Sequence, residues 1–394
     1  MHMGLFSKKK HEASGLIGID IGAGGMKAVE LVQQDGRLRL KTYAYSALKD
    51  RSKDQKALLE DPKRAGVILR EMMKKAKMTS SEANASLPSH SVFHAIVTIP
   101  QPKDAKEDIK PMIDTQVKKL LPMPIEDMIL DSTVIDKHLL PKAKPVEKRK
   151  EKKGDVVTKT SEPVDIGISA RKTQQHIRVL ISGAPKELVA KYIAIFKSAK
   201  LTLASLETEA FALIRSLVGK DPSRIMIVDV GFERTNITIV DGGIPYLHRS
   251  IKAGGQNVTA MIAKQMSLPM DQAEQAKLDM ALGVPKDQIP PVLREAMMPI
   301  LHEIRYSFEL YGQQLFHENS TVEKIILTGG SALIPQLDPF LTEALNMNVY
   351  LGDPWARIAA PEGLRPVLNE IGPRFSVSLG LAMKLSGKSK SLKK

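Results

Sequence analysis

Two segments of the chain, about 200 residues apart, share one order of features. Each is an apolar run ending in an acid, then a glycine turn, then a second apolar run. Residues 15–33 contain Asp20, and residues 225–243 contain Asp229. Apolar, β-branched runs around a glycine turn predict a β-hairpin. The repeated order indicates an internal duplication and predicts an α/β fold with two similar lobes.

The length of the chain also predicts more than one domain. At 394 residues it exceeds the roughly 250 to 300 residues at which a single hydrophobic core stops growing. Hydrophobic periodicity and turn residues predict the other elements. We expect strands over 37–46, 83–87, 91–99, 127–136, 176–182, 244–251 and 323–334. We expect helices over 55–77 (interrupted at Pro62), 104–120, 185–199 and most of 256–320, and a helix, a strand and a helix in turn over 335–385.

The net charge of +14 is confined to three segments. Lys8–Lys10, the stretch 137–153 and four lysines after position 387 account for 13 of the 14 charges. Because the remainder is close to neutral, we expect no nucleic-acid partner. The basic segments have few apolar anchors, so we interpret them as disordered and solubilising. The alternative is a peripheral membrane contact through anionic lipids.

Some classes of protein are excluded by what the sequence lacks. It has no cysteine, which excludes disulfide frameworks and thiolate metal sites. It has no run of about 18 consecutive apolar residues and no signal-peptide core at its amino end. We therefore expect a cytoplasmic protein.

The turn of the first hairpin, IDIGAGGMKAV at residues 19–29, has the composition of a phosphate-binding loop. It is not a P-loop, because the chain has no G-x-x-x-x-G-K-[ST] string. It is not a dinucleotide fingerprint either. Gly22 and Gly24 have the required spacing, but Lys27 takes the place of the last glycine, and a strand follows instead of a helix.

A glycine-bent hairpin can still bind phosphate, because its backbone amides form a concave anion site. Here an acid can hold Mg²⁺ through water and a lysine can supply a positive charge. An ordinary glycine turn is the alternative for either hairpin alone. Two such hairpins, however, can close on one triphosphate from opposite sides. The predicted phosphate-binding residues are Gly22, Ala23, Gly24, Gly25, Lys27, Gly231, Phe232, Glu233 and Asn236, and the predicted metal ligands are Asp20 and Asp229.

A third segment, IILTGGSAL at residues 325–333, ends an apolar strand with Gly329 and Gly330, followed by Ser331. The glycines leave bare backbone against which a base and a ribose can lie. Such a segment alone is often just a turn. In the order hairpin, hairpin, strand with Gly-Gly-Ser, it predicts a nucleotide site.

At these residues the chain resembles the actin-like ATPase superfamily. Phosphate-1 matches 20–27, connect-1 matches 206–212, phosphate-2 matches 229–236, the adenosine motif matches 328–331 and connect-2 matches 371–380. Other stretches are similar to the PilM family of type IV pilus assembly proteins, and together they cover nearly the whole chain. They include LLPMPIEDMILD (120–131), LETEAFALIRSL (206–217), YLHRSIKAGG (246–255) and IGPRFSVSLGLAMK (371–384).

The resemblance implies an actin-like (ribonuclease H-like, duplicated) two-lobe fold with an FtsA/PilM-type subdomain 1C. It implies ATP or ADP with Mg²⁺ between the lobes, and it adds Gly254 and Gly255 to the nucleotide residues. The implied organisation is a basic tail (1–13), subdomain 1A (14–89 and 204–223), 1C (90–203, with the basic insert 137–173), 2A (224–267 and 321–386), 2B (268–320) and a basic tail (387–394).

The resemblance further implies a cytoplasmic adaptor at the inner-membrane face, which binds the N-terminal peptide of a PilN-like membrane protein. Pilus motor ATPases, a platform protein and a homo-oligomeric ring are further implied partners. We hypothesise that the rigid segment with Pro122, Pro124 and Ile125 lines the peptide groove. The alternative is an ordinary connection between a helix and a strand.

Glu209 lies where relatives carry the acid that orients the attacking water. The alternative is a carboxylate that favours a helix start. The resemblance implies a slow ATPase at most, with the nucleotide as a structural ligand. Two other functions stay open: an FtsA-like filament-forming membrane tether, which needs a C-terminal amphipathic helix, and a small-molecule kinase, which needs a substrate motif.

Overall fold

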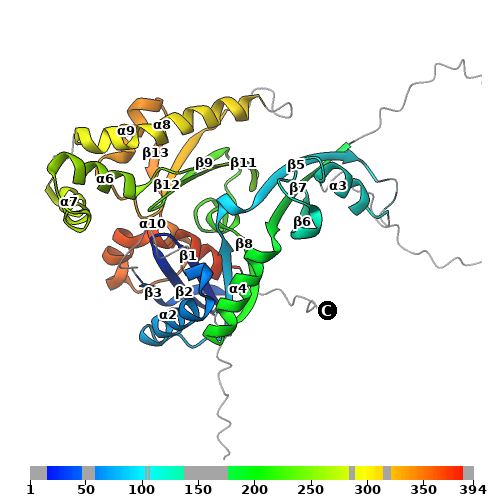
Figure 1. Cartoon of the computed structure of the whole chain (residues 1–394), viewed down its shortest axis with the longest axis horizontal. Coiled ribbons are helices and arrows are strands. Elements are labelled where there is room, and N and C mark those ends of the chain that lie inside the picture. Colours follow the sequence, from blue (N-terminus) through cyan, green and yellow to red (C-terminus); the bar gives the residue numbers. More distant parts are fainter. Residues whose placement is uncertain are drawn as a thin grey trace, which may run out of the picture. The chain divides into compact units, whose positions relative to one another are not determined.

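A computed structural model describes residues 16–46, 58–102, 104, 107–136, 176–283, 289–313 and 321–384 (Figure 1). The chain divides into two compact units. The large unit comprises Met1–Val92 and Ala184–Lys394, and the small unit comprises Phe93–Gly183. The basic insert 137–173 and both predicted tails lie outside the described residues.

The first sheet of the large unit has the strand order β3-β2-β1-β4-β8. Its strands are β1 (Leu16–Gly22), β2 (Gly25–Gln34), β3 (Arg37–Ser46), β4 (Glu82–Leu87) and β8 (Thr202–Thr208). The three strands β1, β2 and β3 are antiparallel neighbours, and β4 and β8 continue the sheet in parallel. The predicted hairpin is confirmed.

The second sheet repeats this arrangement with the order β11-β10-β9-β12-β13. Its strands are β9 (Ile225–Val230), β10 (Thr235–Asp241), β11 (Ile244–Ile251), β12 (Lys324–Thr328) and β13 (Val349–Leu351). Again the first three strands are antiparallel neighbours and the last two are parallel additions. The same topology in both sheets confirms the duplicated α/β fold.

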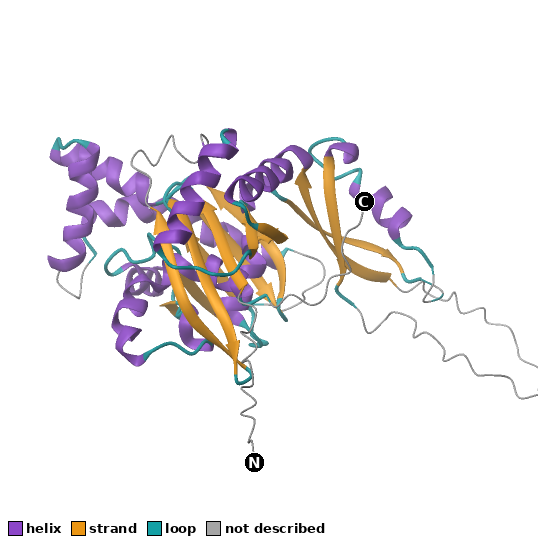
Figure 2. Cartoon of the chain, turned by 90° about the horizontal axis from the view of Figure 1, so that it is seen from below, coloured by secondary structure: helices purple, strands orange, loops and turns teal. Residues whose placement is uncertain are grey.

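Helices cover the sheets and join them (Figure 2). In β1 the side chains of Ile17, Ile19 and Ile21 belong to the core beneath α2 (Pro62–Lys75) and α4 (Lys186–Ala199). Because side chains of a strand alternate between its faces, Gly18 faces the other side. There α10 (Arg365–Ala382) lies so close that a Cβ on Gly18 would be 1.9 Å from the Ser378 carbonyl oxygen.

Two segments connect the halves of the large unit. One is α5 (Glu209–Leu213), continued by a π-helix over Ile214–Val218, and the other leads into α10. Residues of both segments pack with the second sheet in one apolar cluster. The remaining helices are α6 (Gly255–Met266), α7 (Met270–Gly283), α8 (Pro291–Gly312) and α9 (Leu337–Leu345), with short 3-10 turns at Ser89–Ser91, Pro354–Arg357 and Glu362–Leu364.

The small unit is a three-stranded sheet with one described helix. The strand order is β5 (Phe93–Pro100), β7 (His176–Pro185), β6 (Met128–Val134), and the helix α3 spans Lys110–Val117. Alternate residues of β5 and β7 share an apolar cluster with α3.

Two predicted elements are too long. The helix predicted over 104–120 spans Lys110–Val117, because Pro111 has no N–H to donate and its ring obstructs a preceding turn, so that it fits only the first turn of a helix. The strand predicted over 323–334 ends at Thr328, since Gly329 has φ +89° and turns the chain. Among the described helices, none is long and apolar enough to cross a membrane.

Candidate functional site

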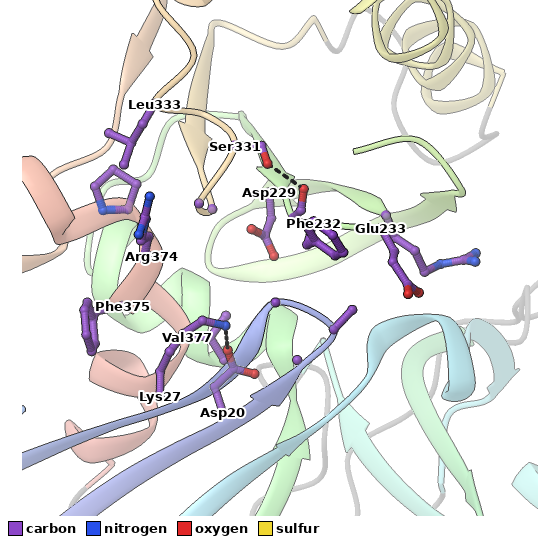
Figure 3. Close-up of a pocket in the computed structure, with 18 of the residues that line it drawn as sticks. Asp20, Lys27, Asp229, Phe232, Glu233, Ser331, Leu333, Arg374, Phe375 and Val377 are labelled. Atoms are coloured by element: carbon purple, nitrogen blue, oxygen red, sulfur yellow. Dashed lines mark hydrogen bonds and ion pairs between the residues drawn. The ribbon is translucent and has the colours of Figure 1, made fainter. Parts of the chain in front are cut away.

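The large unit has a pocket where the two hairpin turns, the turn after β12 and helices α7 and α10 meet (Figure 3). Fourteen of the residues predicted from the sequence line it. They are Asp20, Gly22, Ala23, Gly24, Lys27, Glu209, Asp229, Gly231, Phe232, Glu233, Asn236, Gly329, Gly330 and Ser331. Asp20 and Asp229, which come from the duplicated hairpins, therefore face the same cavity.

Lys27 and Asp20 form an ion pair inside this pocket. They are direct partners in the β1–β2 register, and the Lys27 Nζ atom lies 2.8 Å from the Asp20 carboxylate. Burial alone lowers the pKa of Lys27, but the carboxylates of Asp20, Asp229 and Glu209 outweigh it, so that the pKa is raised. Lys27 is therefore charged over the whole physiological range.

Glu209 is a buried carboxyl group at the start of α5. Its Oε2 atom accepts hydrogen bonds from the Ser89 backbone N–H and the Asn236 side-chain amide, each at 3.1 Å. Burial raises the pKa of Glu209 to about 8, and the charges of Asp20 and Asp229 add to this shift. Burial, together with the Asp20 charge, likewise raises the pKa of Asp229 to about 6. The floor of the pocket thus holds more carboxyl groups than one lysine can neutralise.

Gly329 is required at its position by both its backbone and its surroundings. Its φ is +89°, and a Cβ there would lie 2.4 Å from an Asp229 carboxylate oxygen and 2.5 Å from the Val230 carbonyl oxygen. The Ser331 hydroxyl donates to the Gly231 carbonyl oxygen at 2.8 Å. These contacts fix the turn after β12 against the second hairpin.

Three predicted nucleotide residues do not line the pocket. Gly25 lies within β2, where its φ of +126° allows the tight turn from β1. Gly254 and Gly255 lie behind the second hairpin turn, and the Gly255 N–H donates to the Gly231 carbonyl oxygen at 3.0 Å. A Cβ on Gly254 would lie 2.7 Å from the carbonyl oxygens of both Gly231 and Phe232. These glycines allow close packing that supports the turn.

The structure adds pocket residues that the motifs did not predict. They include Tyr45, His90, Arg234, Glu274, Lys277, Leu278, Leu333, Pro373, Arg374 and Phe375. Lys277 donates to Glu274 at 2.6 Å and to Thr259 at 2.9 Å. The spacing of three residues between Glu274 and Lys277 on a predicted helix was a usable signal, because it places both on one face.

Pro122, Pro124 and Ile125 lie in the small unit, in the connection from α3 to β6. Both prolines are exposed, and Ile125 is half-buried at the start of a 3-10 turn over Ile125–Asp127. Their predicted role in a peptide groove stays a hypothesis.

The chain is similar to a known family and to proteins of known structure. The family described as "Type IV pilus assembly protein PilM" matches residues 18–147 and 164–386. The structure of a PilM-PilN type IV pilus biogenesis complex is 23% identical, covers 94% of this chain and 97% of that chain, and superposes with a TM-score of 0.71. The ethanolamine utilisation protein EutJ of Carboxydothermus hydrogenoformans is 15% identical over 93% of this chain and 88% of its own, with a TM-score of 0.49.

The cell division protein FtsA of Borreliella burgdorferi is 27% identical over 180 residues. That match spans 40% of this chain and 42% of FtsA, so less than half of this curated relative is represented. The family match, by contrast, extends over most of the chain and over both sheets. The chain belongs to the PilM family of type IV pilus assembly proteins and has the actin-like fold.

Proposed function

We propose that the pocket of the large unit binds Mg-ATP or Mg-ADP, and that the protein acts as a nucleotide-dependent adaptor of a type IV pilus assembly platform. One observation carries the nucleotide part. Equivalent glycine turns of two duplicated hairpins, each with an acid, line one pocket together with the Gly-Gly-Ser turn after β12.

The residues present fit this ligand. Backbone N–H groups of both glycine turns supply donors for phosphate oxygens. Asp20 and Asp229 offer carboxylates to Mg²⁺, with water as the remaining ligands. Among the described residues no cluster of three acids or histidines could hold a metal alone, which suits a cation brought in with phosphates. Lys27, now paired with Asp20, lies at the turn, since a Cβ on Gly22 would be 3.3 Å from its Nζ atom, and it can therefore be shared with a phosphate.

Slow turnover fits the state of Glu209. Unless a bound cation lowers it, a pKa of about 8 keeps the Glu209 carboxyl group protonated at neutral pH, and a protonated acid cannot accept a proton from water. The nucleotide then acts mainly as a ligand that holds the two halves of the large unit together. At a free concentration 100 times its dissociation constant, a ligand adds about 2.7 kcal/mol of stability.

Titration calorimetry of the full chain with Mg-ATP tests the nucleotide site. Lys27→Ala removes a charge from the pocket, and Gly330→Val fills bare backbone that lies against Arg374. We expect each to lower the affinity about tenfold or more. Lys191→Ala is the matched control, because Lys191 pairs with Glu187 on the exposed side of α4. Equal affinities in all four proteins would refute the site.

The partner part of the proposal rests on family membership and on the PilN component of the similar complex. We propose that the chain works at the cytoplasmic face of the inner membrane, and that its subdomain 1C takes the N-terminal peptide of a PilN-like protein near Pro122 and Pro124. Co-purification with that partner tests this. Removal of the partner's first residues should abolish capture, and capture that persists would exclude this mode of binding.

A further inference from the structure

Arg374 is placed at the pocket by backbone contacts of the preceding residue. The Pro373 carbonyl oxygen accepts the Gly329 N–H at 3.1 Å and the Thr328 hydroxyl at 3.2 Å. These bonds tie α10 to the turn after β12. A Cβ built on Gly330 would be 3.4 Å from the Arg374 Cγ atom, so the arginine stem lies along the bare face of that glycine.

Among the cations that line the pocket, Arg374 is the one whose side chain has no partner among the described residues. Lys27 is held by Asp20, and Lys277 is held by Glu274. Within the described part of the chain, the Arg374 side chain makes no hydrogen bond and no ion pair, and it is exposed. Figure 3 shows it directed away from the Asp20–Lys27 pair. Its guanidinium plane is thus available at the pocket mouth.

The side chains that follow the Gly-Gly-Ser turn make the adjoining wall apolar. They are Leu333, Ile334 and Pro335, and all three line the pocket. The Ser331 hydroxyl is already donated to the Gly231 carbonyl oxygen. Tyr45, an exposed ring of the same pocket, is the register partner of Lys27 and packs edge-on against Phe375, with ring centroids 6.4 Å apart. The Arg374 end offers a planar cation and apolar surface for a ligand.

We propose that Arg374 holds the nucleobase by stacking its guanidinium on the face of the ring, so that the pocket selects a nucleoside phosphate with little regard to which purine it carries. This inference rests on the proposed nucleotide site and names the residue that recognises the base. An arginine guanidinium stacks on aromatic faces, whereas a lysine ammonium is a compact point charge without a plane. Every purine presents such a face.

Titration calorimetry with three ligands separates the base from the phosphates: Mg-ATP, Mg-GTP and Mg-tripolyphosphate. Arg374→Ala should weaken Mg-ATP binding about 3- to 30-fold, the range of a cation–π contact, and leave Mg-tripolyphosphate unchanged. Arg374→Lys should lose nearly as much as Arg374→Ala, because the charge remains and the plane is lost. The wild type should bind Mg-ATP and Mg-GTP within about threefold. Arg365→Ala, a charge-matched change at the start of the same helix and outside the pocket lining, is the control.

Three results would overturn the inference: unchanged Mg-ATP affinity in Arg374→Ala, full rescue by lysine, or equal loss of tripolyphosphate binding, which would make Arg374 a phosphate ligand. A wild type that binds Mg-ATP more than tenfold tighter than Mg-GTP would overturn the inference that the pocket hardly distinguishes one purine from another. A wild type that binds neither nucleotide would instead refute the proposed function. Thermal unfolding of each variant shows whether the fold is kept.

Discussion

Replacing Glu209 with glutamine should stabilise the protein in a pH-dependent manner. Both hydrogen-bond donors to Glu209, the Ser89 N–H and the Asn236 amide, contact the same carboxylate oxygen. The carbonyl oxygen of a glutamine can therefore accept both, and Glu209→Gln preserves the contacts while removing the ionisable group. Removal of the ionisable group therefore changes the free energy of unfolding more than any change in hydrogen bonding does.

The magnitude follows from the shift of the pKa of Glu209 from its ordinary value of 4.5 to about 8. The folded chain binds the proton more tightly than the unfolded chain, so the stabilisation is complete below pH 4.5 and is lost as the pH rises to about 8. Each pH unit within this window costs about 1.4 kcal/mol. Between pH 5 and pH 7.5 the wild type should therefore lose about 3 kcal/mol that Glu209→Gln keeps.

Urea unfolding from pH 5 to pH 7.5, without nucleotide or Mg²⁺, measures this difference. The control is Glu207→Gln, two residues earlier, where the carboxylate pairs with Arg215 at 2.8 Å and Lys384 at 3.0 Å. Loss of those pairs should destabilise the protein by about 1 to 3 kcal/mol at pH 7.5, the opposite sign. If the stability of Glu209→Gln falls with pH as steeply as that of the wild type, burial does not raise the pKa of Glu209 and the reasoning is refuted.

Two further substitutions test the packing that holds the pocket. Gly380→Ala should destabilise the large unit by about 3 kcal/mol or more, because its Cβ would be 1.9 Å from the Ala212 carbonyl oxygen. Gly363→Ala, with open space around it, is the control and should change the stability by less than about 0.5 kcal/mol. Urea unfolding measures both variants, and equal values would contradict the close approach of α10 to α5. Glu30→Gln should cost about 1 to 3 kcal/mol in the same assay, because its fully buried carboxylate accepts the Ser80 N–H at 2.9 Å and pairs with Lys41, and an unchanged midpoint would exclude this role.

The sequence predicted the hairpins well because their pattern is local. An apolar strand, an acid and a glycine turn follow one another within a dozen residues, and Asp20 and Lys27 become register partners simply because the turn is short. Because the same pattern recurs around Asp229, the sequence also predicted the duplicated fold. The ends of the elements were less predictable. An amphipathic pattern that extends over 104–120 does not show where the helix starts, whereas Pro111 in the first turn places the start at Lys110.

Other pocket residues depend on contacts between distant segments. Glu274 and Lys277 reach the pocket only because α7 packs beside α6, and Arg374 reaches it because Pro373 bonds to the turn at Gly329. The spacing of Glu274 and Lys277 indicates a shared helix face, but nothing near these residues in the sequence indicates which segments they contact. Gly254, predicted as a nucleotide residue, does not line the pocket. A glycine that permits close backbone packing and a glycine that faces a ligand look alike in a sequence.

The duplication is symmetric in topology but not in charge. Lys27 is the register partner of Asp20, and the equivalent partner of Asp229 is the neutral Asn236. The second hairpin therefore brings an acid without the cation that accompanies it in the first, and Glu209 adds another carboxyl group beside Asn236. Burial is the main cause of the raised pKa values of Asp229 and Glu209, and the rest of both shifts comes from this imbalance. A divalent cation between the two hairpins would remove it, which is why the charge pattern of this pocket favours a phosphate ligand that arrives with Mg²⁺ over one that arrives alone.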